Sequence, residues 1–170
     1  GMADKAEFWR ERAAIIRGKI EDEAWHEEGQ HYASALGGTH LDASLLQMID
    51  LGFLKPEDER FQKTFAAIEK GLRRGEHMLR YDAEDDFGLP ETAFNICTFW
   101  LMEALHLAGR KDEARALFET MLSHRTKSGL LSEDLDFNNG ELWGNFPQTY
   151  SLVGIINCAT LLSKPWSVIR

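Results

Sequence analysis

Apolar side chains recur at helical spacing in six blocks of this chain, and connections rich in Gly, Asp and Asn separate the blocks. A spacing of three to four residues places apolar side chains on one face of an α-helix, so the pattern predicts six helices. Amphipathic blocks alternate with blocks that are apolar nearly all round. We therefore expect an all-α fold of stacked helical hairpins, in which each hairpin buries its apolar face against its neighbours.

The first three predicted helices cover about residues 4–21, 42–52 and 56–72. Asp42 suits the start of the second helix, because an aspartate side chain accepts a hydrogen bond from the first turn, and Gly52 suits its end. The third helix begins at a proline and has an acidic first turn, which complements the positive end of the helix dipole. The first helix offers an apolar stripe that consists of Phe8, Ala13, Ile15, Ile16 and Ile20.

The last three predicted helices cover residues 94–107, 111–124 and 147–162. The first and third of these are apolar nearly all round, which predicts burial on more than one side. A tetratricopeptide repeat would have a period of about 34 residues and shorter turns, so we prefer longer helical hairpins. Similar transitions from loop to helix recur, about 50 residues apart, at residues 41–43, 90–92 and 146–148.

The composition is typical of one globular domain with a neutral ligand. With 170 residues and 44% hydrophobic side chains, the chain is long enough to bury a substantial core. Its formal net charge of -9 argues against a nucleic-acid partner, because phosphate binding depends on basic contacts. No apolar stretch reaches the roughly 20 residues needed to cross a bilayer, and the N-terminus lacks the plan of a secretion signal. We therefore expect a cytoplasmic protein that binds neither nucleic acid nor membrane.

Neither the cysteines nor the histidines predict a metal or cofactor site. Cys97 and Cys158 lie within apolar helical patterns and have no cysteine close in sequence, which is typical of small core residues. His26, His31 and His40 are close in sequence, but their spacing is not that of a helical ligand pair four residues apart. We expect no metal ion and no cofactor.

The densest group of unusual residues lies between residues 129 and 148. Glu133 follows an apolar lead-in and precedes an aromatic-rich turn with Trp143, so its carboxylate is suited to a partly desolvated cleft. Asp136 and the Asn-Asn-Gly sequence that follows at 138–140 are typical of an exposed turn. Composition alone therefore leaves both a catalytic carboxylate and a solvated loop residue open for Glu133.

Several segments of the chain resemble the family 15 glycoside hydrolases, which include glucoamylases, glucodextranases and some bacterial trehalases. The closing segment carries the most specific match, with GLLSEDLD at 129–136, GNFPQ at 144–148 and then Ser151. The resemblance extends over about residues 8–162, because upstream segments are similar to the preceding loops and inner helices of the family. These segments are Arg80-Tyr81 with Asp85-Asp86, residues 91–94, residues 99–105, and residues 41–46 preceded by Trp25 and Tyr32.

The resemblance implies a fragment of an α/α toroid, since the family fold is a barrel of twelve helices in six hairpins. Six helices amount to half of such a ring, so residues 1–170 are expected to be a single all-α domain similar to the C-terminal half of a glucoamylase-like catalytic domain. Gly1 and Met2 are expected to be a tag remnant and the initiator methionine. A half ring exposes apolar faces, which predicts a homo-oligomer or a complementary chain that completes the toroid.

The resemblance also implies an inverting α-glycosidase that acts on an α-linked gluco-oligosaccharide or a similar sugar. In such an enzyme a carboxylic acid protonates the leaving oxygen while a carboxylate activates water on the opposite face of the sugar. The general base of the family lies in a Ser-Glu-x-x-Asp segment, and Glu133 holds that position here. Sugar contacts are expected from Arg80, Tyr81, Glu91, Trp143, Gln148 and Tyr150.

The general acid of the family lies in a Trp-Glu segment that precedes the part matched here. Trp9-Arg10-Glu11 is a poor substitute, because it lies within a predicted helix and not in a loop that faces a cleft. General acid catalysis contributes about 10²- to 10⁴-fold, so the chain alone is expected to be a weak or inactive hydrolase. A hydrolase that needs a partner, a non-catalytic carbohydrate-binding domain and a purely structural domain all stay open, and epimerase toroids share this architecture.

Overall fold

The computed structural model describes residues 2–84, 86 and 88–163. These residues form the predicted all-α fold, with six α-helices and only short strands. None of the described helices is both long and apolar enough to cross a membrane. The helices are α1 (Ala3–Glu23), α2 (Gln47–Asp50), α3 (Glu59–Leu72), α4 (Asn95–Leu107), α5 (Lys111–Ser123) and α6 (Thr149–Leu162).

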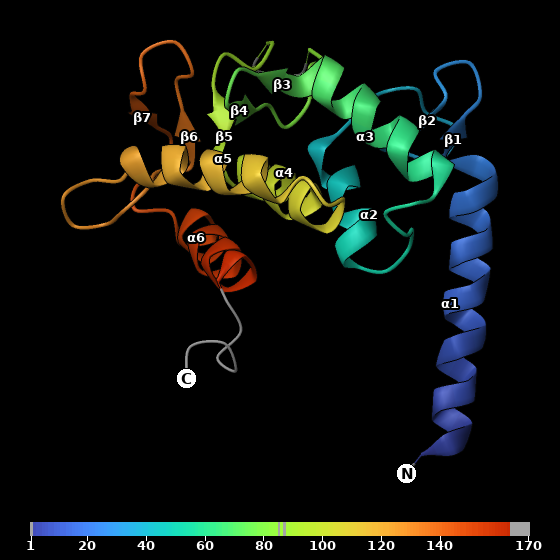
Figure 1. Ribbon diagram of the computed structural model, residues 1–170. Helices are drawn as coiled ribbons and strands as arrows, with labels where there is room; N and C mark the ends of the chain where they lie inside the picture. Colours follow the sequence, from blue (N-terminus) through green and yellow to red (C-terminus); the bar gives the residue numbers. More distant parts are fainter. Residues whose placement is uncertain (1, 85, 87, 164–170) are drawn as a thin grey trace.

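Helix α4 forms the centre of the fold. It packs against α5, against α6, and against α2 with the preceding 3₁₀ turn η1 (Ala43–Leu46) (Figure 1). Most of its side chains are buried, and Phe99, Leu101 and Leu105 have no exposed surface. Its sequence is apolar nearly all round because it has neighbours on several sides, as predicted.

Helices α3 and α5 are amphipathic and each packs one face on the core. The guanidinium of Arg110, at the start of α5, lies 2.5 Å from Glu69 Oε2 on α3, so an ion pair joins the outer surfaces of the two helices. Amphipathic outer helices thus alternate along the chain with more apolar inner ones, which is the predicted hairpin arrangement. The buried residues on the two outer helices are Phe61, Thr64, Phe65, Ile68, Leu72, Ala114, Leu117, Phe118 and Met121.

The second predicted helix is shorter and more tightly wound than its sequence suggests. Asp42 caps it as predicted, since Ser44 N donates a hydrogen bond to Asp42 Oδ1 at 2.7 Å. The chain then forms the 3₁₀ turn η1 before the single α-helical turn α2, and Gly52 follows with a φ of 66°. The tighter winding coincides with burial of the consecutive residues Leu45 and Leu46.

Helix α1 departs most from its predicted role. Its apolar stripe exists, but none of its residues is buried, and Trp9 and Ile15 are 66% and 61% exposed. Figure 1 shows α1 projecting from the rest of the fold, and its C-terminal end contacts β1 (Trp25–His26). Arg17 fixes that end, because its guanidinium donates to Phe53 O and lies 4.4 Å from the centre of the Phe53 ring. Within the described part of the chain, Ile20 at the C-terminal end of the stripe packs against the core, whereas Phe8, Ile15 and Ile16 are exposed.

Helix α6 is buried on one side only, which corrects the prediction of burial on more than one side. Cys158 is fully buried, as is Cys97 on α4, so both cysteines are core residues as predicted. A β-carbon at Gly154 would lie 2.6 Å from Phe99 Cγ, so α6 approaches α4 closely. The opposite face of α6 is exposed, with Ile156 at 63%, because α4 and α5 are the helices that cover α6 among the described residues.

Candidate functional site

The connections that precede α4 and α6 meet in a three-stranded antiparallel sheet with β6 in the middle. Two antiparallel hairpins, β1–β2 and β3–β4, lie in the earlier connections. Figure 1 shows all of these strands toward the top of the view, beside α3 and on one side of α4, α5 and α6, so the connections gather at one end of the hairpin stack. Besides β1, the strands are β2 (His31–Tyr32), β3 (Arg73–Arg74), β4 (His77–Met78), β5 (Ala93–Phe94), β6 (Asp134–Leu135) and β7 (Leu142–Trp143).

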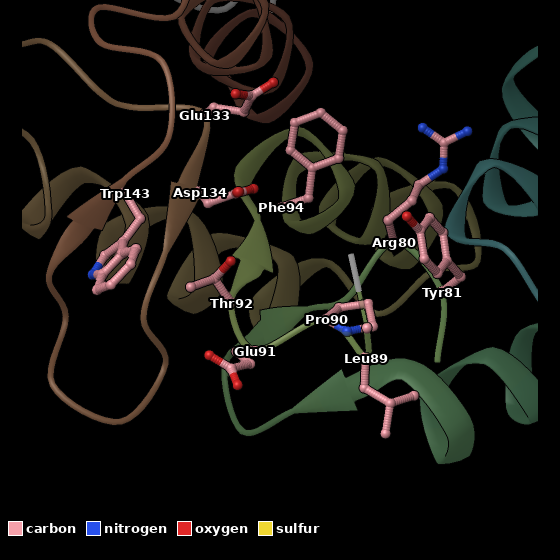
Figure 2. Close-up of a pocket in the computed structure, with 11 residues that line it drawn as sticks. Arg80, Tyr81, Leu89, Pro90, Glu91, Thr92, Phe94, Glu133, Asp134 and Trp143 are labelled. Atoms are coloured by element: carbon pink, nitrogen blue, oxygen red, sulfur yellow. The ribbon is translucent and has the colours of Figure 1, made fainter. Parts of the chain in front are cut away.

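A cleft of about 600 Å³ lies beside the three-stranded sheet (Figure 2). Clefts of a few hundred cubic ångströms are typical of sites for small molecules. Arg80 and Glu133, which are far apart in the sequence, both line it. The other lining residues are Tyr81, Gly88, Leu89, Pro90, Glu91, Thr92, Phe94, Asp134 and Trp143.

The cleft brings together five of the seven residues that the sequence analysis selected: Arg80, Tyr81, Glu91, Glu133 and Trp143. Gln148 and Tyr150 are not among its lining residues. Gln148 occupies the N-cap position of α6 without a capping hydrogen bond from its side chain, and its backbone N–H donates to Leu131 O at 3.0 Å. Tyr150 lies on the exposed face of α6, where its ring packs edge-on to Trp100 with the ring centroids 6.1 Å apart.

Glu133 is held by hydrogen bonds on both its backbone and its side chain. Its N–H donates to Asn145 O at 2.9 Å, and its carbonyl oxygen accepts from Asn95 N at 3.0 Å. The carboxylate Oε2 accepts from Asn145 N at 3.2 Å and from Asn145 Nδ2 at 2.7 Å. Among the described residues, both hydrogen bonds to the carboxylate end at Oε2, so Oε1 is the oxygen that can accept from a substrate or a water molecule.

Gly144→Ala is expected to lower the free energy of unfolding and to displace the carboxylate of Glu133. Gly144 has a φ of 76°, and this conformation costs a residue with a side chain about 1–3 kcal/mol. In addition, a β-carbon at this position would lie 3.1 Å from Glu133 Oε2. Gly129→Ala is the matched control, because Gly129 has a φ of 80° but no atom within 4 Å of the added carbon. Urea denaturation should show losses of stability in both variants. Calorimetric titration with an α-linked gluco-oligosaccharide, the ligand that the sequence resemblance implies, should show weaker binding only for Gly144→Ala, and equal binding would contradict the contact with Glu133.

Arg80 provides a fixed positive charge on another wall of the cleft. Its Nε donates to Asp42 Oδ1 at 2.9 Å and to Oδ2 at 2.8 Å, and its backbone oxygen accepts from Ala43 N at 2.8 Å. Burial disfavours the charged guanidinium, but the hydrogen bond and the negative charge of Asp42 outweigh this effect and raise the pKa of Arg80. The guanidinium carbon also lies 5.7 Å from the centre of the Trp100 ring. The residue that caps η1 therefore also positions Arg80.

Asp134 lines the cleft beside Glu133, although the sequence analysis did not select it. Burial, followed by the negative charge of Glu133, raises the pKa of Asp134 from 3.8 to about 6, against the opposing effect of a hydrogen bond from Thr92. The sequence did contain one indication that Asp134 belongs to the site, because Asp134 directly follows Glu133 in the matched segment. The direction of its side chain, however, depends on strand pairing. The cleft residues Gly88, Leu89, Pro90, Thr92 and Phe94 are likewise not predicted as site residues.

No group of three or more His, Cys, Asp or Glu side chains in the described part of the chain is arranged to hold a metal ion. His26 and His31 do lie together, with ring centroids 5.3 Å apart. His31 Nδ1 is 2.9 Å from Tyr32 O, which fixes the orientation of that ring. The groups that the cleft offers to a ligand are therefore carboxylates, a guanidinium and aromatic rings.

The fold and the cleft together define a class of protein. Helical hairpins present charged groups and aromatic rings around one small cleft, and these groups suit the hydroxyl groups and the apolar faces of sugar rings. Residues 1–160 match the family described as glycosyl hydrolases family 15. The chain belongs to that family, as its sequence resemblance predicts.

The curated relatives that match this chain include several trehalases. The trehalase of Thermoplasma volcanium is 32% identical over 166 residues, which are 96% of this chain and 26% of the relative. The trehalase of Thermoplasma acidophilum is 37% identical over 155 residues, which are 85% of this chain and 26% of the relative. The trehalase of Mycobacterium tuberculosis is 33% identical over 160 residues, which are 92% of this chain and 23% of the relative. The chain thus spans about a quarter of the length of these relatives.

Solved structures of a glycosidase share the fold. The wild-type glycosidase superposes with a TM-score of 0.77 at 22% identity, over 89% of this chain and 43% of the other. A variant of that protein, solved in complex with glucose, superposes equally well. The similarity confirms that the six helices form a fragment of an α/α toroid.

Proposed function

We propose that this chain supplies the general-base half of an inverting α-glucoside hydrolase, with trehalose as its substrate. The observation that carries the proposal is the presence of Glu133 and Arg80 in one cleft of about 600 Å³, a volume that suits a small sugar. The names of the related trehalases support the choice of substrate.

In the proposed reaction Glu133 acts as the general base. Asn145 holds its Oε2, and its Oε1 accepts a proton from a water molecule as the water oxygen attacks the anomeric carbon. The bond between the anomeric carbon and the glycosidic oxygen breaks, and the leaving oxygen takes a proton from a general acid. Attack on the face opposite the leaving group inverts the anomeric configuration.

The general acid is proposed to come from outside the described hairpins. Trp9-Arg10-Glu11 lies on the exposed part of α1, and Figure 1 shows this part projecting away from the strands. The two carboxyl groups of an inverting glycosidase stand about 6.5–9.5 Å apart, with room for water between the base and the sugar. An acid that meets this requirement would face Glu133 across the cleft.

Exposed apolar side chains support packing against a complementary half. On α6, Val153 and Ile156 are exposed, and on α1, Ile15 and Ile16 are exposed. Contiguous exposed apolar surface usually marks an interface. The proposed occupant is a further set of helical hairpins that completes the toroid. A second copy of this chain could complete the ring, but only a complementary chain could also supply the acid. Light scattering tests the association, and a monomer that hydrolyses trehalose at full rate would contradict it.

Hydrolysis of trehalose, maltose and isomaltose by the assembled protein tests the proposed activity. We expect the fastest glucose release from trehalose, and we expect proton NMR to show that the attacked ring is released as β-glucose, because inversion converts an α-linkage into the β-anomer. Release of that ring as α-glucose would contradict the inverting mechanism. Equal rates on all three sugars would contradict the choice of substrate.

A carbohydrate-binding domain without catalysis is the second candidate function. The exposed position of Glu11 on α1, together with the aromatic and charged residues of the cleft, favours it. Saturable binding of trehalose with no glucose release from any assembled form would support this function over hydrolysis.

A further inference from the structure

Three cleft residues form one row across the strands. The pairing of β5 with β6 places Phe94 opposite Asp134, and the pairing of β6 with β7 places Asp134 opposite Trp143. Directly opposed residues of antiparallel strands project to the same face of a sheet. All three line the cleft, and Figure 2 shows Asp134 between Trp143 on one side and Phe94 on the other.

The carboxylate of Asp134 has acceptor capacity to offer a ligand. Thr92 donates a hydrogen bond to it, and Figure 2 shows Thr92 beside it. An ionised carboxylate accepts about four hydrogen bonds, so Thr92, the one side-chain donor to Asp134 among the described residues, leaves most of its capacity available. Glu133, in contrast, already receives two hydrogen bonds from Asn145 on one oxygen. The two adjacent carboxylates are therefore held in different ways.

The aromatic neighbours of Asp134 suit a sugar ring. Trp143 is 53% exposed, and its indole Nε1 donates to Glu141 Oε2 at 3.3 Å, which orients the ring. The C–H-rich face of a pyranose packs well against an aromatic ring, while its hydroxyl groups need acceptors at the edge. The row of residues therefore offers an aromatic ring for the face of the sugar and a hydrogen-bond acceptor for its hydroxyl groups side by side.

We propose that Asp134 is a substrate-binding residue, which accepts hydrogen bonds from the hydroxyl groups of a glucopyranose ring packed against Trp143. This inference rests on the proposed function, because it assigns a contact within the same cleft. A site that is built to bind a hydroxyl group rejects an analogue that lacks it, since the buried acceptor then has no donor. Asp134 thereby selects fully hydroxylated sugars over deoxy sugars.

Asp134→Asn tests the inference, with trehalose as the probe in calorimetric titrations of the full chain. We expect the affinity to fall about tenfold, because a hydrogen bond to a charged acceptor is replaced by one to a neutral acceptor. Asp136→Asn is the matched control. Asp136 lies on the same segment but outside the cleft lining, and asparagine can preserve its hydrogen bond to Asn138 N. Wild-type affinity in Asp134→Asn would overturn the inference, as would no binding of trehalose to the unmodified chain.

The pH dependence of binding to the unmodified chain provides a readout that does not depend on the folding of a variant. Affinity should rise as the pH increases through about 6, where Asp134 ionises, and this rise should be absent in Asp134→Asn. A flat profile between about pH 5 and 7 in the unmodified chain would overturn the inference. The other titratable groups around Asp134 are Glu133, Glu91, Cys97, Arg80 and Tyr81.

Glu133→Gln separates this inference from the proposed function. Normal hydrolysis by Glu133→Gln, together with weak binding by Asp134→Asn, would contradict the general base while leaving the binding role of Asp134 intact. Loss of hydrolysis in Glu133→Gln with unchanged binding in Asp134→Asn would support the general base and contradict the binding role of Asp134.

Discussion

Under the proposed function, Glu133→Gln is expected to lower the turnover of trehalose by the completed toroid about 10²- to 10⁴-fold, the usual contribution of a general base. Glutamine has nearly the same shape, and its carbonyl oxygen can accept the hydrogen bonds that Asn145 donates to Glu133. Its amide group, however, cannot take the proton of the attacking water. Steady-state measurement of glucose release should therefore show a large loss, whereas calorimetric titration should show almost unchanged binding.

Glu119→Gln is the matched control for the loss of one negative charge. Glu119 is an exposed residue of α5 and does not line the cleft, so its substitution should leave turnover unchanged. Turnover by Glu133→Gln within about tenfold of the unmodified protein would be too high for a missing general base. A parallel loss of binding and turnover would instead assign Glu133 to positioning the sugar.

The helices whose partners lie within this chain were predictable from periodicity. On α3 and α5 the apolar spacing alone identifies the buried face, and Ile68 and Met121 are indeed fully buried. The sequence of α4 similarly predicts burial on several sides. In these helices the local pattern and the tertiary contacts agree.

The roles of α1 and α6 could not be predicted in the same way. A stripe identifies which face of a helix is apolar, but it contains no information on whether a partner is present. Ile16 on α1 and Ile156 on α6 are 60% and 63% exposed, although both belong to apolar patterns. The two helices have apolar faces that the described hairpins do not cover, as expected for part of a ring.

Some residues of the candidate site could be selected from a short sequence segment alone. Glu133 and Arg80 were selected in this way, and both line the same cleft. Asp134 could not be selected in this way, because a strand of two residues is too short to show an alternation of apolar and polar residues. Only the pairing of β6 with β5 and β7 aligns its side chain with the cleft. Gln148 and Tyr150 belong to the matched region but lie at the start of α6, outside the lining of the cleft. Strand pairing and helix boundaries, rather than motif membership, decide these three positions.

Glu103→Gln is expected to raise the free energy of unfolding by about 1–2 kcal/mol near pH 8, less than the pKa shift would give in full, because Glu103 is only half-buried and solvent screens its charge. Burial, followed by the negative charge of Asp50, raises the pKa of Glu103 on α4 from 4.5 to about 7, against a hydrogen bond from Gln47 that lowers it. A carboxyl group with a raised pKa binds its proton more tightly in the folded state. Its stabilising contribution is therefore fully present below about pH 4.5 and is lost as the pH rises through about 7.

The pH dependence of this gain distinguishes a buried charge from a change in packing. Urea denaturation should show almost no gain for Glu103→Gln at about pH 4 and the full gain by about pH 8, because glutamine carries no charge at either pH. Glu113→Gln should behave in the opposite way. Burial disfavours the charge of Glu113, but hydrogen bonds from Arg73 and Arg110 outweigh this effect and lower its pKa, so its contribution is present above its ordinary pKa of 4.5 and lost on acidification. A gain for Glu103→Gln that is equal at both pH values would mean that packing around α4, and not the ionised carboxylate, limits the stability of the fold.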